Sequence, residues 1–581
     1  MAVITLVPVT AIENRPCPVR PTGDAPTGAA VVSLDAAVTT RCRRRVHLDH
    51  DPEAVGLPRA LPDPSLEQRR ADAAAHRAHI GERLAAAAGP GWHVVPASAS
   101  TRERIASTTA AVHADAPLIW GAVLPDVGAA GRRGGAELLV RVAGGGYLPV
   151  IVVRHRITDP GSGALTSPLV EPSPRRALPD PARKVRSQPR DLLRLAHLNR
   201  MLHAAGWAPV AELVHGDHGG VIGMDADVVV WHDLRAGHWP GARSTLAEYD
   251  TRFADRTAVA TAAATGAPAL AAPSRITECR HCPWWPTCEA DLERVEDVSL
   301  VVRGEPAAVL RDLGVRTVGQ LAALDPALEP PIPPAGVPFA DMIALARARQ
   351  RGLSVVRRVP RTPVLRADVE VDVDMESFGE AGAYLWGVLL HHPGGARPGD
   401  EPDGYRAFAT WEPVPTVDEA RSFAEFWAWF TGVREAARAS GRSFAAYCYN
   451  EQAENRWLLA SARRFAGLPG VPPVAEIEEF IAGPCWVDLF AVVSEWFLCA
   501  HGKGLKRIAP AAGFSWHDPE AGGENSMRWY RDAVGMDGAP PDEAQRRRLL
   551  EYNADDVAAT RALREWMTSA AIDEVPLATD L

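Results

Sequence analysis

The sequence lacks several features that would each define a class of protein. Its 581 residues contain no run of eighteen apolar residues, which excludes a membrane-spanning helix of the usual length. Its start has no basic segment followed by a long apolar stretch, so we expect no secretory signal and a cytoplasmic protein. A G-x4-G-K-[ST] loop is also absent, which excludes a helicase motor of the P-loop type.

Positive charge is scarce as well. The formal net charge is −10 and lysine is nearly absent, so the chain is not coated with cations. A local basic groove would still be enough for a nucleic-acid enzyme, and metal-binding carboxylates lower the net charge. With 47% hydrophobic and 23% charged residues, the composition is ordinary for a globular protein, and the length predicts about three domains.

The distribution of helix-like and strand-like segments predicts an α/β protein in four parts. Residues 1–30 are proline-rich and predict an extended lead-in. Residues 31–296 predict an α/β domain, in which a Pro-, Ser- and Arg-rich stretch at 159–188 predicts a long exposed loop. Residues 297–360 predict a small helical module resembling half of a helix-hairpin-helix, a motif that points backbone amides at a phosphate; a plain linker fits equally well. Residues 361–575 form the last part.

This last part has the clearest order of elements. Extended segments predict strands at Ala367–Met375, Ala383–Leu390, Tyr405–Trp411 and Phe444–Tyr449. Helical spacing predicts helices at Thr416–Ala439, Glu451–Ala466, Leu489–Ala500 and Gln545–Met567. Three strands followed by alternating helices and strands (βββαβαβα) resemble the ribonuclease-H-like fold.

Three cysteines lie close together in the stretch ECRHCPWWPTCEA. In a cytosolic chain, Cys279, Cys282 and Cys288 predict a metal or cluster site, with Cys42 as the best fourth ligand. Ligation of distant residues would stabilise the fold of the domain that they enclose. The spacing resembles the RecB-type nucleases with an iron–sulfur site, such as the AddB-like and CRISPR-associated ones. The resemblance implies a [4Fe–4S] cluster and a restriction-endonuclease-like domain; a zinc site with four cysteine ligands is the alternative.

The same domain lacks the catalytic ligands that a RecB-type nuclease uses. That family has a carboxylate on one strand, Asp/Glu-x-Lys on the next and Gln-x3-Tyr on a helix. Glu137 stands at the first position, but Ile151 and Val153 occupy the second, and Arg194 and Leu198 the third. One carboxylate offers too few hard oxygen ligands for a divalent cation. We therefore predict that this domain is catalytically inactive and grips nucleic acid.

Three acidic motifs in the last part resemble those of the DEDD-type (DnaQ-like) exonucleases. Residues two apart on a strand share a face, and residues four apart share a face of a helix. The family pattern is Asp-x-Glu, Asn-x3-Asp and Tyr-x3-Asp. The motifs here are Asp374-Met-Glu376, Asn450-x3-Glu454 and Tyr552-x3-Asp556. Glu454 departs from the usual Asp, and Asp488 is an alternative source of that ligand.

The resemblance implies two-metal hydrolysis of phosphodiester bonds. Two Mg²⁺ or Mn²⁺ ions would be held by four carboxylates, and Tyr552 would orient the attacking water. The four carboxylates are those of Asp374, Glu376, Glu454 and Asp556. Hard oxygen ligands suit these ions better than they suit zinc.

A short basic stretch near these motifs predicts contacts with the substrate. Lys503, Lys506 and Arg507, together with Asn450, are the expected nucleic-acid contacts, because cations follow a phosphate backbone. A solvated surface loop is the alternative for the basic stretch.

Together these patterns predict a metal-dependent 3′→5′ exonuclease. We expect it to act on nucleic acid, single-stranded DNA in the first instance, with a helicase or repair protein as partner. A non-catalytic iron–sulfur DNA-binding accessory protein and an RNA 3′-end exonuclease are the alternatives.

Overall fold

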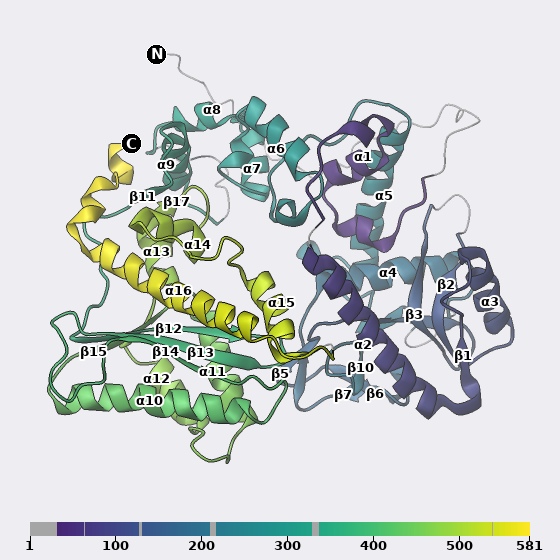
Figure 1. Cartoon of the computed structure of the whole chain (residues 1–581). Coiled ribbons are helices and arrows are strands. Elements are labelled where there is room, and N and C mark those ends of the chain that lie inside the picture. Colours follow the sequence, from purple (N-terminus) through teal and green to yellow (C-terminus); the bar gives the residue numbers. More distant parts are fainter. Residues whose placement is uncertain are drawn as a thin grey trace. The chain divides into compact units, whose positions relative to one another are not determined.

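The computed structural model describes residues 32–62, 64–126, 131–209, 216–327, 330, 336–536 and 538–581. It confirms a mixed α/β chain with several sheets (Figure 1). The chain divides into two compact units, the first ending at Glu293 and the second beginning at Arg294. Among the described residues, no helix is both long and apolar enough to cross a membrane. The lead-in expected at 1–30 lies outside the described residues.

The first unit is built on an eight-stranded sheet with the strand order β1-β2-β3-β4-β9-β10-β6-β7. These strands are β1 (Trp92–Val94), β2 (Leu118–Leu124), β3 (Gly134–Arg141), β4 (Tyr147–Val152), β6 (Leu165–Pro168), β7 (Leu178–Pro179), β9 (His218–Ile222) and β10 (Val228–Asp233). Its helices are α1 (Arg43–His50), α2 (Pro64–Ala88), α3 (Thr101–His113), α4 (Pro189–Ala204), α5 (Thr245–Ala264) and α6 (Trp285–Arg294).

Both faces of this sheet are buried at its centre. Leu138 of β3 and Val150 of β4 share a hydrophobic cluster with Ile80 of α2. Their neighbours Leu139 and Ile151 belong to the cluster that includes residues of α4 and α5. Successive side chains of a strand point to opposite faces, so a strand covered on both sides is a continuous apolar run, as β4 is.

The prediction of a long exposed loop at 159–188 is wrong. This stretch contains β6 and β7 of the large sheet and a small ladder between β5 (Thr158–Pro160) and β8 (Arg183–Val185). β6 pairs with β10, which lies some sixty residues further along the chain. Proline is tolerated in short strands at an edge, so the proline content of this stretch does not exclude strands. Composition did not indicate them, because β10, the strand that joins β6 to the large sheet, lies in another part of the chain.

The second unit contains a five-stranded sheet with the order β14-β13-β12-β15-β16. Its strands are β12 (Val369–Ser377), β13 (Ala383–His391), β14 (Gly404–Ala409), β15 (Phe444–Cys448) and β16 (Trp486–Asp488). The first three are antiparallel, and β15 and β16 continue the sheet in parallel with β12. The four strands predicted between 367 and 449 are therefore present.

Two long helices cover the opposite faces of this sheet. α10 (Glu419–Ala439) packs on one face, where Phe423 and Phe426 contact Trp386 of β13. α16 (Glu543–Thr568) runs along the other face, against β12 and β13 (Figure 1). Residues of alternate register on β12 therefore face either the aromatic core or α16.

Shorter elements complete the second unit. They are α7 (Glu305–Asp312), α8 (Val318–Ala322), α9 (Phe339–Gln350), β11 (Val355–Arg357), α11 (Gln452–Arg464), α12 (Val474–Ile481), α13 (Leu489–Trp496), β17 (Phe497–Cys499), α14 (Leu505–Ile508) and α15 (Gly523–Val534). The helix predicted at Leu489–Ala500 is wrong in its last third, because 497–499 pair with β11. The partner strand, β11, lies in the part of the chain predicted as a helical module. Local periodicity at 497–499 does not indicate pairing with so distant a segment.

Candidate metal centre

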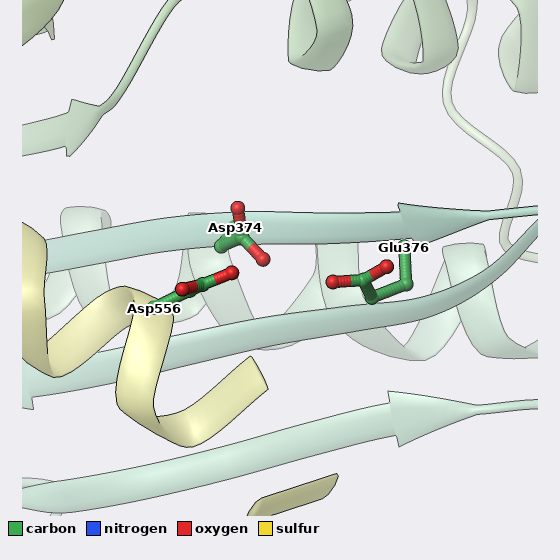
Figure 2. Close-up of side chains that lie close together, drawn as sticks. All are labelled: Asp374, Glu376 and Asp556. Atoms are coloured by element: carbon green, nitrogen blue, oxygen red, sulfur yellow. The ribbon is translucent and has the colours of Figure 1, made fainter. Parts of the chain in front are cut away.

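Three carboxylates converge between β12 and α16. Asp374 and Glu376 lie two residues apart on β12, and Asp556 reaches toward them from α16 (Figure 2). One ligand oxygen from each lies within 4.8 Å of the others. Several hard oxygen donors at this spacing fit a divalent cation such as Mg²⁺ or Mn²⁺.

The electrostatics of the cluster also favour a cation. Asp374 is half-buried, and Glu376 and Asp556 are buried. Removal from water and then the charge of Asp556 raise the pKa of Glu376 to about 8. The pKa of Asp374 lies well above its ordinary value for the same two reasons, and burial raises that of Asp556. Carboxyls that repel one another in this way gain from any cation that neutralises them.

Glu454 lies beside this cluster but outside the group of three. It belongs to the first turn of α11, is 3% exposed, and its Oε2 has no hydrogen-bond partner. Burial raises its pKa to about 8, with further contributions from Asp488 and Glu376. A buried carboxylate oxygen without a donor has unused capacity for a ligand.

The alternative ligand Asp488 has a structural role. Its Oδ1 accepts from the backbone N–H of Phe490, which caps α13, and from that of Asn450 at 2.9 Å. Asn450 itself is exposed and adopts a left-handed φ of 74°. Asp488 therefore stabilises the turn after β15. Of the two candidate ligands, Glu454 is the one with a buried carboxylate oxygen that accepts no hydrogen bond.

The basic stretch contributes one side chain to the centre. Lys506 donates to the Tyr552 hydroxyl at 2.9 Å, and its Nζ lies 4.0 Å from Asp556 Oδ1. Lys503 instead donates to the Ser494 carbonyl at 3.3 Å, and Arg507 is exposed. Of the three cations predicted to contact substrate, Lys506 is thus the one beside the carboxylates.

Each carboxylate of the cluster also accepts a hydrogen bond that the sequence did not indicate. Asn553 Nδ2 donates to Asp374 at 2.7 Å, Ser526 Oγ to Glu376 at 3.1 Å, and Trp516 Nε1 to Asp556 at 2.6 Å. Such donors fix the orientation of metal ligands. Asn553 could have been found, because it lies three residues before Asp556 and shares its helical face. Ser526 and Trp516 come from separate segments and carry no local signal.

The remaining acids of β12 are neutralised. Arg564 of α16 is fully buried and donates to Asp372 at 2.9 and 3.0 Å, and it lies 3.0 Å from Glu370. Arg366 also donates to Glu370 at 2.7 Å. Two acids of β12, Glu370 and Asp372, are therefore paired with arginine. The other two, Asp374 and Glu376, have no such partner among the described residues, and the charge of Lys506 offsets theirs in part.

Gly387 allows α16 to approach the sheet at this point. It lies opposite Asp374 on β13, and a Cβ there would be 1.5 Å from Asn553 Oδ1. We expect Gly387→Ala to destabilise the protein by about 1–3 kcal/mol, because the overlap must displace Asn553 or α16. We also expect the affinity for Mn²⁺ to fall about 10–100-fold, as for other losses of ligand-orienting contacts. Denaturant unfolding and calorimetric titration with Mn²⁺ measure the two effects.

Gly432→Ala is the matched control, because a Cβ at this position of α10 meets nothing within 4 Å. Alanine there is expected to be neutral or to stabilise the helix by about 1 kcal/mol. Equal behaviour of the two variants would contradict the close approach at Gly387.

The four predicted cluster cysteines of the first unit line one small pocket, with Arg44, Arg45, Ser274, Glu278 and Trp285. The backbone N–H of Cys42 donates to Glu278 at 2.6 Å, so the two ends of the unit meet here. Burial raises the pKa of Cys282 to about 11 and that of Cys288 to about 12. Among these described thiols, no three sulfurs lie within 4.8 Å of one another.

An arginine pairs with Glu137, the acidic residue at the expected ligand position of the first unit. Arg194 of α4 donates to both oxygens of Glu137, at 2.8 and 3.0 Å. Ile151 and Leu198, which stand where the RecB resemblance expects ligands, are buried core residues. The one carboxylate at this position is therefore held in an ion pair with Arg194.

A family model described as the RNase_H superfamily matches residues 476–568. The matched segment contains Tyr552 and Asp556 and supports a ribonuclease-H-like domain at this end of the chain. No curated protein and no solved structure matches the chain.

Proposed function

We propose that the second unit is a metal-dependent exonuclease of the DEDD type. The observation that carries the proposal is the approach of Asp374, Glu376 and Asp556 within 4.8 Å of one another. Among the described residues, no arginine forms an ion pair with any of the three. Asp372, on the same strand as Asp374 and Glu376, is paired with Arg564 of α16, so the fold can neutralise such acids. The match to the RNase_H superfamily supports a nuclease-type activity.

The side chains of the centre take distinct roles in this proposal. Asp374, Glu376 and Asp556, with Glu454 as a further ligand, would hold Mg²⁺ or Mn²⁺, which supply a hydroxide nucleophile and stabilise the leaving oxygen when bound. Tyr552, one helical turn before Asp556, would orient the attacking water. Lys506 holds the Tyr552 hydroxyl and places a positive charge where a substrate phosphate would lie.

For the substrate we propose single-stranded DNA, degraded from its 3′ end. The resemblance of the three motifs supports this direction, and a helicase or repair protein would then supply the unpaired end. Degradation of 5′-labelled and 3′-labelled strands with Mn²⁺ tests it, because only 3′→5′ digestion shortens the 5′-labelled strand progressively. The same assay with RNA tests the alternative of an RNA 3′-end exonuclease, and digestion from the 5′ end would contradict the polarity.

The carboxyls also make the stability of the metal-free protein depend on pH. The pKa of Glu454 is about 8 in the fold and ordinarily 4.5, so the folded protein binds more protons between these values and loses stability as pH rises. We expect Glu454→Gln in EDTA to melt higher than wild type at about pH 8 and nearly equally at about pH 5. With Mn²⁺ the order at the higher pH should reverse, because the variant has lost a ligand. Thermal melts that show no such reversal would count against Glu454 as a ligand.

We further propose that the first unit is a RecB-like domain that holds a [4Fe–4S] cluster and does not cut nucleic acid. In a tetrahedral zinc site, bonds of about 2.3 Å place all sulfurs about 3.8 Å apart. No three of the four described sulfurs lie within 4.8 Å of one another, which supports a group larger than a single zinc ion. The cluster would join the beginning and end of the unit.

The identity of this group can be tested by substitution. Protein purified without oxygen is expected to be coloured and to contain about four iron atoms, and Cys282→Ser to lose most of them. The variant should also unfold more readily, because ligation energy stabilises the fold. Cys485→Ser, at a half-buried cysteine outside the pocket, is the control. A colourless protein with one zinc ion per chain would refute the cluster.

A further inference from the structure

A hollow on the first unit has the composition of an anion site. It has a volume of about 380 Å³ and is lined by Arg77 of α2, Arg104 of α3 and Glu137 of β3, together with residues 120–123 and 135–136. We propose that this hollow binds a phosphodiester of a nucleic-acid strand and takes no divalent cation. The identification of the phosphate as part of a nucleic acid rests on the function proposed for the second unit.

The charge balance of the hollow is positive. Both oxygens of Glu137 are taken by Arg194, so the one carboxylate of the lining is neutralised by a residue outside the lining. Arg77 and Arg104 then have no ion-pair partner in the part of the chain that the structure describes. A divalent cation would meet these two guanidinium groups and a carboxylate that is already paired, whereas a phosphate would meet complementary charge.

The hydrogen-bond donors of these arginines are also largely unused. Arg104 donates to the Gly121 carbonyl at 3.3 Å, but its buried Nε has no partner. Among the residues that the structure describes, no hydrogen bond or ion pair involves Arg77. A guanidinium has five N–H donors in a planar fork that matches two phosphate oxygens. A phosphate in the hollow would satisfy donors that the protein itself leaves open.

The floor of the hollow leaves room for such a group. Besides Trp120 and Val123, the uncharged lining consists of the small residues Ala78, Gly121, Ala122, Gly135 and Ala136. Gly121 has a φ of 71°, a left-handed conformation that glycine adopts without strain. Short side chains at these positions let a phosphate approach the guanidinium groups without obstruction.

The test measures binding separately from cleavage. Full-length protein with Asp374→Asn, kept in EDTA, is titrated against fluorescently labelled single-stranded DNA at several salt concentrations. Adding Arg77→Gln and Arg104→Gln is expected to weaken binding about 10-fold and to reduce the slope of log affinity against log salt by about one to two. Arg102→Gln, an exposed position on the same helix α3, is the control and should bind as the parent does.

The outcomes separate the two proposals. Unchanged affinity and salt slope in the double variant would overturn the phosphate site, whatever the nuclease assay shows. Reduced binding together with a wild type that cuts no nucleic acid would support this site and refute the proposed function. If calorimetry shows inorganic phosphate binding that the double variant loses while DNA binding stays unchanged, the strand is not the ligand and the proposal fails. If the Arg104→Gln variant unfolds, the affinity and salt slope are measured with Arg77→Gln alone.

Discussion

Asp374→Asn is expected to lower Mn²⁺-dependent degradation of single-stranded DNA by about three orders of magnitude. A metal site contributes several kcal/mol of transition-state stabilisation, and each 1.4 kcal/mol corresponds to about a tenfold change in rate. The substitution removes one of the three carboxylates that lie within 4.8 Å of one another. Initial rates with labelled oligonucleotide measure the effect.

The same variant should gain stability in the absence of metal. Asn still accepts the hydrogen bond from Asn553, and it removes a charge that Asp556 and Glu376 repel. A melting temperature in EDTA above that of wild type, together with lost activity, identifies a residue kept for function rather than for folding. Loss of activity through unfolding would give the opposite shift.

Glu137→Ala is the control from the first unit. It removes the carboxylate that Arg194 already pairs, in a hollow proposed to bind and not to cut, so the cleavage rate at saturating DNA is expected to remain. Activity that is lost in the Glu137 variant and kept in the Asp374 variant would assign cleavage to the first unit. Wild type without activity on DNA or RNA would leave the non-catalytic accessory protein as the better description.

Arg564→Met is expected to destabilise the protein by about 3–5 kcal/mol. The substitution leaves the carboxylate of Asp372 buried without a partner, and removing one member of a buried ion pair has this effect. Glu370 loses one of its two guanidinium partners as well. Chemical denaturation with a probe of the second unit measures the difference in free energy of unfolding.

Two further variants test the reason for this loss. Arg561→Met, on the same helix but partly exposed and paired with Glu565, is expected to change stability by less than about 1 kcal/mol. Adding Asp372→Asn to Arg564→Met should recover part of the loss, because the buried charge is then gone. Equal destabilisation by the Arg561 and Arg564 variants would contradict the assignment of the loss to an unpaired buried carboxylate.

The first four strands of the five-stranded sheet and the helices α10, α11 and α16 followed from local pattern. Alternating acids and valines on β12 and the four-residue spacing of Tyr552 and Asp556 depend only on the periods of strand and helix. Local pattern failed where pairing came from distant backbone, as for β6 and β17. A short apolar run such as 497–499 fits a helix or a strand until its neighbour is known.

The sequence by itself determined that the acids of β12 share one face and that Asp556 and Tyr552 share one face of α16, because both follow from residue spacing. Only the tertiary structure decided which acids converge and which are paired with arginine. Arg564 neutralises Asp372 and leaves Asp374 and Glu376 facing Asp556. Charge compensation in a buried site depends on side chains from distant segments that meet only in the folded chain.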